Sequence, residues 1–243
     1  AVECVLDELA EEIKMCPLEF RLKNAAKEGT KAVHGPIYPK MGYLETVEAA
    51  LNHPHYKSPL NKLQGRGVAS GFWFNAGGES CAQVNITEDG NVVVTTGHPD
   101  IGGSRASIAN ITAELLGIDV NRVSVLIGDT ASIGFSNLTG GSRVLFASAM
   151  VVTESTKQVV DILKQRAAKI WEIDEDAVNW ENGEARPAGD NAGKFKPLTL
   201  AQIADKATPT GGPIGAGHQV NTVGAEGGFA THICDVEVDI ELG

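Results

Sequence analysis

The four-residue run Gly-Gly-Ser-Arg occurs twice in this chain, at residues 102–105 and at 140–143. Each copy follows an apolar, β-branched run and precedes a stretch with helical periodicity. A glycine turn that opens a helix leaves backbone N–H groups without internal acceptors, and these groups attract anions. Two such turns therefore predict a ligand that carries phosphate groups or several polar edges.

A simpler interpretation stays open for each turn. Glycine at 97–105 also suits an ordinary strand–turn–helix junction with positive φ, and Ser142 suits a helix N-cap. Neither turn is a P-loop or a dinucleotide-binding Gly-x-Gly-x-x-Gly. On the ligand interpretation, Arg105 adds a charge-assisted contact. The cofactor-binding residues that we expect are Gly102, Gly103, Ser104, Arg105, Thr139, Gly140, Gly141, Ser142 and Arg143.

The net charge of -11 makes nucleic acid and anionic membranes unexpected partners, because both repel an acidic surface. No apolar run approaches the ~20 residues that span a bilayer, and no signal peptide is visible. The four cysteines are widely spaced and lack a Cys-x-x-Cys pair. This spacing favours buried free thiols in a reducing compartment over a disulfide framework, which predicts a cytoplasmic protein.

Hydrophobic periodicity predicts both helices and strands. Helices are expected over residues 5–13, 17–26 and 43–51, in a segment ending at Gly117, and over 142–171 and 198–207. Strands are expected over residues 68–75, 80–87, 91–96, 123–127, 218–223 and 229–240. Residues 172–197 are expected to be a weakly ordered excursion, with a hairpin about Asn182-Gly183. Without regular β-α-β alternation, the pattern favours an α+β fold in which a mixed sheet packs with helices.

Three other features carry weaker signals. His98, beside the first turn, either faces a ligand or stabilises the turn, while His53-x-His55 is interpreted as a solvated pair rather than a metal site. The cluster Phe72-Trp73-Phe74 stands out in a chain with 5% aromatic residues. Phe72 and Trp73 are candidates for a substrate pocket, with core packing as the alternative. Spacing alone predicts no catalytic side chain and no set of metal ligands.

The chain begins at Ala1, without Met, inside an amphipathic pattern, and it ends at Gly243 shortly after an alternating strand. Both ends suggest a piece of a longer polypeptide, with a processed complete protein as the alternative.

Four stretches in order along the chain resemble the molybdenum-cofactor-binding large subunit of the xanthine dehydrogenase, aldehyde oxidase and carbon monoxide dehydrogenase family. The first two stretches are a helix pair ending in Arg-x-Lys-Asn at residues 8–24 and a segment from Asp-Ile-Gly-Gly-Ser to Ala-Glu-Leu-Leu-Gly at residues 100–118. The other two are a strand ending Gly-Asp-Thr with its following loop at residues 123–142 and a Val-Glu-Val-Asp strand at residues 235–239. It implies that residues 1–64 are the helical tail of a first molybdopterin-binding domain plus a connector, and that residues 65–243 are part of a second such domain.

The resemblance also implies a cofactor and an activity. The cofactor is molybdopterin, with its cytosine dinucleotide form as one option, and it serves the oxidation of an aldehyde, purine or N-heteroaromatic small molecule. Iron–sulfur and FAD centres are expected on other subunits or segments, so the implied partners are those subunits and the remaining segments of the molybdenum subunit.

One position departs from the family pattern, which has Gly-Gln-Gly where this chain has Gly102-Gly103-Ser104. The glutamine contact is lost at Gly103, so backbone N–H groups with Ser104 or Arg105 replace it, or cofactor binding is weaker. The family's glutamate base and its arginine-bearing glycine segment lie outside this sequence, and we expect the chain alone to be inactive. The alternatives are a phosphate-binding module without redox chemistry and a scaffold relative without cofactor.

Overall fold

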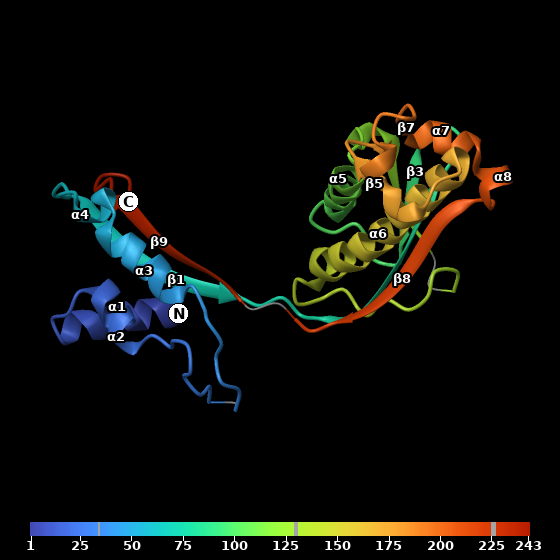
Figure 1. Cartoon of the computed structure of the whole chain (residues 1–243). Coiled ribbons are helices and arrows are strands. Elements are labelled where there is room, and N and C mark those ends of the chain that lie inside the picture. Colours follow the sequence, from blue (N-terminus) through green and yellow to red (C-terminus); the bar gives the residue numbers. More distant parts are fainter. Residues whose placement is uncertain (34, 129–130, 225–226) are drawn as a thin grey trace. The chain divides into compact units, whose positions relative to one another are not determined.

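The computed structural model describes residues 1–33, 35–128, 131–224 and 227–243. Two compact units make up the chain: residues 1–74 with 226–243 form the first, and residues 75–225 form the second (Figure 1). Each unit contains both helices and strands, as the α+β prediction requires.

The first unit combines four helices with a two-stranded ribbon. Its elements are α1 (Val2–Glu12), α2 (Pro17–Asn24), α3 (Tyr43–Asn52), α4 (Pro54–Lys57), β1 (Gln64–Trp73) and β9 (Gly228–Glu237). Strands β1 and β9 pair antiparallel along their whole length. Proline at the first position of α2 fits there because that N–H needs no acceptor. Leu18, Val47, Ala50 and Val68 form the small core between the helices and β1.

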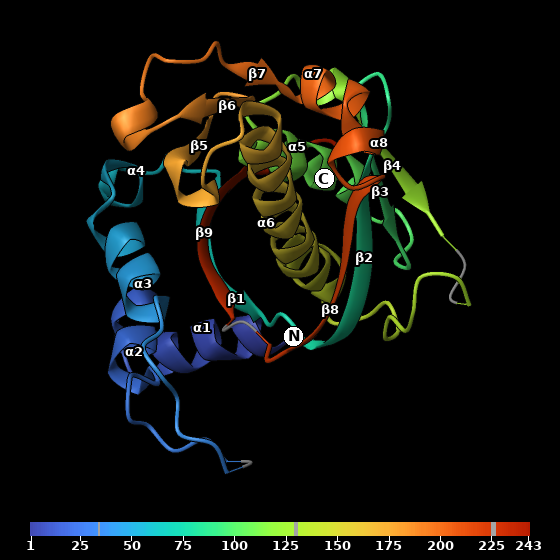
Figure 2. The same ribbon diagram turned by 45° about the vertical axis from the view of Figure 1, so that its right-hand side comes forward.

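The second unit is built on a four-stranded mixed sheet. Its strands are β2 (Gly78–Ile86), β3 (Val92–Thr96), β4 (Val123–Ile127) and β8 (Ile214–Thr222), in the order β4-β3-β2-β8. Only the β3–β4 pair is parallel among these strands, because α5 (Ser104–Leu116) connects them as a crossover. The long helix α6 (Arg143–Trp171) packs against β2, β8 and α5 (Figure 2).

Smaller elements complete the second unit. They are η1 (Val120–Arg122), η2 (Glu175–Ala177), β5 (Val178–Glu181), β6 (Glu184–Pro187), η3 (Gly189–Asn191), β7 (Leu198–Thr199), α7 (Leu200–Asp205) and α8 (Ala207–Thr210). The core contains apolar residues of the sheet, of both long helices and of these smaller elements. The predicted mixed sheet packed with helices is therefore confirmed.

The prediction that residues 172–197 are weakly ordered is wrong. Strands β5, β6 and β7 form their own sheet, and Val178 and Ala185 are fully buried in the main core. The hairpin about Asn182-Gly183 is confirmed, with both turn residues at positive φ. Two buried side chains and a tight turn order this segment despite its polar composition.

Two other expectations change with the structure. All four cysteines are free, but only Cys81 is buried, whereas Cys4 and Cys234 are exposed. The first unit includes β1 because that strand pairs with β9 rather than with the four-stranded sheet. The assignment of residues 1–64 and 65–243 to two cofactor-binding domains stays a prediction. Within the part of the chain that the structure describes, no helix is long and apolar enough to cross a membrane.

Candidate functional site

The second unit contains a cavity of about 700 Å³ that both glycine turns line. Its wall is formed by Asn75, Ile101, Gly102, Thr139, Gly140, Gly141, Ser142, Arg143, Val144, Leu145 and Phe146. The turns are almost forty residues apart in sequence, so only the fold brings them to one place. Six of the nine predicted cofactor-binding residues meet here, whereas Gly103, Ser104 and Arg105 lie outside this wall.

The second turn presents free backbone groups at the start of α6. Gly141 and Ser142 both have positive φ, at 64° and 58°. For a residue other than glycine, this conformation costs about 1–2 kcal/mol. The Ser142 side chain makes no capping hydrogen bond, and among the described residues no acceptor is found for the N–H groups of Gly140, Gly141 and Ser142. The N-cap interpretation therefore fails for the Ser142 side chain, and these donors are available to an anion.

At the first turn, Gly102 and Gly103 also have positive φ, with open space where a Cβ would stand. Asp100 Oδ1 accepts a hydrogen bond from the backbone N–H of Arg105 at 3.1 Å, which satisfies one donor at the start of α5. Ser104 is buried, and its hydroxyl contacts Asp100 and the backbone of Pro99. Because the Arg105 guanidinium donates to the carbonyl of Val125 at 2.9 Å, these two side chains support α5 and β4.

Arg143 positions the second turn rather than presenting a charge to the cavity. Its side chain is almost fully buried, and it donates to the carbonyl groups of Gly77 (2.7 Å), Asn137 (3.0 Å) and Glu79 (2.6 Å). Burial lowers the pKa of the Arg143 guanidinium, while the negative charge of Glu79 opposes this shift. The pKa of Glu79 is itself lowered by its own backbone N–H and by the amide of Asn137.

His98 is 1% exposed and lies directly before the first turn. Its Nε2 shares a hydrogen bond of 2.9 Å with the Ser80 hydroxyl, and its Nδ1 has no partner in the described part of the chain. Burial, with the nearby Arg143 charge, lowers the pKa of His98 to about 4. The ring is therefore neutral at pH 7, and its Ser80 contact supports the turn-stabilising interpretation.

The aromatic cluster on β1 does not belong to the core. Phe72, Trp73 and Phe74 are 67%, 60% and 49% exposed, so the core-packing interpretation is wrong. Phe72 stacks on Phe229 and lines a separate cavity in the first unit, whereas Trp73 stacks on Phe74.

Other sequence-based interpretations have plainer outcomes. His53 and His55 are exposed, as a solvated pair should be, although His55 Nε2 lies 3.3 Å from Asp235. No cluster of three or more metal-ligating side chains occurs among the residues that are described. Asp129 and Thr130, the end of the Gly-Asp-Thr motif, lie outside the described residues.

Sequence reasoning missed several cavity residues, namely Asn75, Ile101, Val144, Leu145 and Phe146. Asn75 lies far from both turns in sequence. The backbone N–H of the next residue, Ala76, donates to the Gly141 carbonyl at 2.8 Å, and this hydrogen bond holds the segment beside the second turn. The apolar residues after Ser142 stand in a stretch with helical periodicity, which gave no sign that some of them line a cavity.

Comparison with known proteins identifies relatives of this chain. A molybdopterin cofactor-binding domain family matches residues 40–243. The aldehyde oxidoreductase molybdenum-binding subunit PaoC of Escherichia coli (strain K12) is 31% identical over 141 residues, covering 54% of this chain and 19% of that protein. A probable xanthine dehydrogenase component of Bacillus subtilis (strain 168) is 26% identical, and the match covers 100% of this chain and 34% of that protein.

Solved structures share the fold. The Cu,Mo-CO dehydrogenase aligns with a TM-score of 0.78 at 19% identity, over 98% of this chain and 34% of that chain. Quinoline 2-oxidoreductase from Pseudomonas putida 86 aligns with a TM-score of 0.76 at 21% identity, over 98% of this chain and 34% of that chain. This chain spans about a third or less of each of these relatives. It belongs to the molybdopterin cofactor-binding domain family found in xanthine dehydrogenases, aldehyde oxidoreductases and carbon monoxide dehydrogenases.

Proposed function

We propose that this chain is part of a molybdenum-dependent oxidoreductase and that its two glycine turns together hold the phosphate end of a molybdopterin cofactor. The observation that carries the proposal is the single cavity lined by both turns. The N–H groups of Gly140, Gly141 and Ser142 have no acceptor among the described residues, and a phosphate is the ligand that suits such donors. The residues present therefore fit the cofactor's anionic end.

Each turn has a defined task in this proposal. Gly102 supplies a backbone donor without a side chain that would fill the cavity, and Ser142 adds a hydroxyl with its N–H. Arg143 holds the second turn in place through backbone carbonyls. Ser104 and Arg105, which the sequence suggested as direct ligands, act by fixing the start of α5. The cofactor, when bound, supplies the redox chemistry for oxidation of an aldehyde, purine or N-heteroaromatic substrate.

The wider assignment extends the same proposal. The cofactor is molybdopterin, with the cytosine dinucleotide form as one option, and iron–sulfur and FAD centres on other subunits or segments accept the electrons. Residues 1–64 and 65–243 belong to the first and second molybdopterin-binding domains of a cytoplasmic enzyme, whose partners exclude nucleic acid and membranes. Exposed Phe72 and Trp73 are its candidate substrate contacts. Because the catalytic base lies on another segment, the chain alone is inactive.

The test uses Ser142 in the longer protein that contains this chain. Ser142→Asp places a negative charge beside the phosphate, whereas Ser142→Asn introduces a neutral side chain of the same size as Asp, and both residues tolerate positive φ. We expect Ser142→Asp to lower molybdenum per protein at least fivefold, and Ser142→Asn to change it less than twofold, by metal analysis of purified protein.

Equal molybdenum in both variants would reject the proposed phosphate site. A wild-type protein without molybdenum that still binds phosphate would favour the non-redox module. Absence of both molybdenum and phosphate binding would favour the scaffold relative, the candidate that Gly103 at the family's glutamine position supports.

A further inference from the structure

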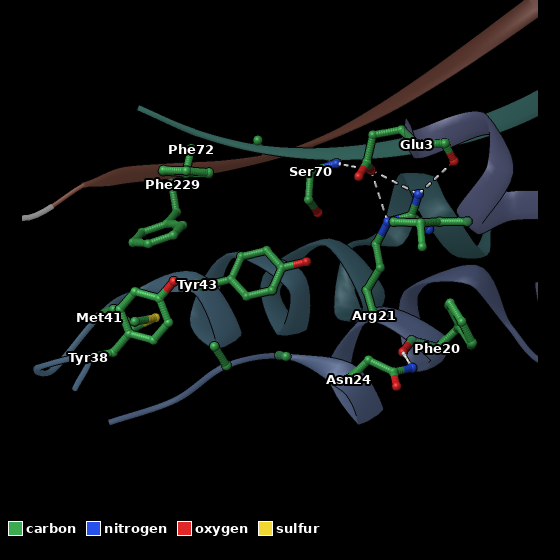
Figure 3. A pocket seen from close by; sticks show the side chains of 14 residues that line it. Glu3, Phe20, Arg21, Asn24, Tyr38, Met41, Tyr43, Ser70, Phe72 and Phe229 are labelled. Carbon is green, nitrogen blue, oxygen red and sulfur yellow. Dashed lines mark hydrogen bonds and ion pairs between the residues drawn. The ribbon is translucent and has the colours of Figure 1, made fainter. Parts of the chain in front are cut away.

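The first unit contains its own cavity, of about 440 Å³, between α1, α2, the loop at residues 25–42 and the β1–β9 ribbon. Small-molecule sites typically occupy about 300–1,000 Å³ and are mostly apolar with a few polar groups. Figure 3 shows Phe72 and Phe229 along the ribbon, Tyr43 beside them, and Tyr38 with Met41 on the loop. The size and composition of this cavity are those of a ligand site.

One wall of the cavity is aromatic. The rings of Tyr43 and Phe229 have centroids 5.7 Å apart, and those of Phe229 and Phe72 are 6.1 Å apart and nearly parallel. These three side chains come from α3, β9 and β1, so packing of separate elements fixes their faces. Met41 adds an adaptable thioether to the lining. Flat ring faces favour a planar aromatic ligand that stacks on them.

The one cation in the described lining of this cavity is already paired with carboxylates. Arg21, whose side chain is 1% exposed, pairs with Glu3 Oε2 at 2.9 Å, and the backbone N–H of Ser70 donates to the same oxygen at 2.6 Å. Arg21 also pairs with Asp7, outside the lining, at 2.8 Å. No unpaired cation is left among the described lining residues, and an anionic ligand would be buried without a partner at high cost. The cavity therefore disfavours an anionic ligand.

Two hydroxyl groups are available for a polar edge of the ligand. No hydrogen bond of the described residues uses the phenol oxygen of Tyr38 or Tyr43, although both residues line the cavity. The other neutral polar side chains each make a hydrogen bond within the protein: Ser70 Oγ with Thr231 Oγ1 at 3.0 Å, and Asn24 Nδ2, which donates to the Phe20 carbonyl at 2.8 Å. The phenols can donate or accept, so a ring nitrogen or N–H group suits them.

We propose that this cavity binds a planar aromatic molecule that carries no negative charge and has a polar ring edge, stacked on Tyr43 and Phe229 and hydrogen-bonded by Tyr38 or Tyr43. The inference concerns the first unit alone and does not depend on the proposed phosphate site. Ser142→Asp therefore leaves this binding unchanged, which keeps failure of either proposal distinguishable from failure of the other.

The test is a titration with indole of the longer protein that contains this chain, followed by calorimetry and by amide chemical shifts. We expect indole to shift the amide signals of Gly71 and Phe229, and indole-3-carboxylate to bind at least tenfold more weakly. No shift at these positions, or equal affinity for the anion, would overturn the proposal.

A pair of variants locates the site. Ala26 lines the cavity, so Ala26→Leu fills part of it, whereas Ala192→Leu makes the same change at an exposed site in the second unit. We expect Ala26→Leu to weaken indole binding at least tenfold, and Ala192→Leu less than twofold. Tyr38→Phe combined with Tyr43→Phe keeps both rings and should weaken indole binding about fivefold. Unchanged affinity in Ala26→Leu, with circular dichroism like the wild type, would contradict the assignment.

Discussion

Arg143 illustrates how far residue identity alone predicts a role. The sequence places it correctly at the start of a helix beside a glycine turn, where a cation suggests an anion ligand. The structure instead directs the guanidinium to carbonyls at residues 77, 79 and 137. Those acceptors are some sixty residues away or sit on an irregular loop, so local spacing carries no trace of them. The neighbouring Ser142, whose N–H has no acceptor among the described residues, by contrast follows from the glycine pattern itself.

His98 gives a prediction at the same scale. An unfolded histidine has a pKa near 6.5, while burial lowers that of folded His98 to about 4. Between these pH values the unfolded chain binds a proton that the folded chain does not, so stability falls as the pH falls from 6.5 to 4. We expect His98→Gln to lose less stability than the wild type from pH 7 to 4, by up to about 3 kcal/mol.

Urea denaturation at several pH values measures this difference. His232→Gln is the control, because it makes the same substitution at an exposed position on β9. Parallel stability curves for the wild type and His98→Gln would contradict the assigned burial of a neutral ring.

At the scale of elements, long periodic segments were predictable and the short ordered ones were not. The stripe of apolar residues over 142–171 predicts α6 almost to the residue. Residues 172–197 lack such a stripe, and their order depends on distant contacts, such as Trp180 Nε1 donating to the Leu116 carbonyl at 3.0 Å. A contact between two elements leaves no periodic pattern in the sequence, which is why the order of this segment could not be predicted.

Two glycines next to α5 allow the cost of a positive φ to be distinguished from the cost of a steric clash. Gly117 and Gly102 have similar positive φ, but a Cβ at Gly117 would lie 2.6 Å from the Gly183 nitrogen, while one at Gly102 meets open space. Alanine in this conformation costs about 1–2 kcal/mol, and overpacking adds roughly 1–3 kcal/mol. We expect Gly117→Ala to destabilise the chain by at least ~1 kcal/mol more than Gly102→Ala in urea denaturation. Equal losses of stability would contradict this expectation and show that the β5–β6 turn moves without cost to accommodate the added methyl group.

At the scale of the whole molecule, the pairing of distant strands could not be predicted from the sequence. The expected strands near residues 68–75 and 229–240 exist, but nothing in their local pattern says that they pair with each other. The compact units divide after residue 74 because β1 pairs with β9, while the expected boundary between two molybdopterin-binding domains after residue 64 stays a prediction. The convergence of both glycine turns on one cavity was the global feature that the repeated Gly-Gly-Ser-Arg run did anticipate.

Amide hydrogen exchange of the longer protein, with and without its cofactor, tests the central claim most directly. If backbone N–H groups of both turns hold one phosphate, peptides covering residues 101–106 and 139–146 should both exchange at least tenfold more slowly in the cofactor-bound protein, while a peptide covering residues 178–187 should not change. Protection of only one turn, or of neither, would contradict the account.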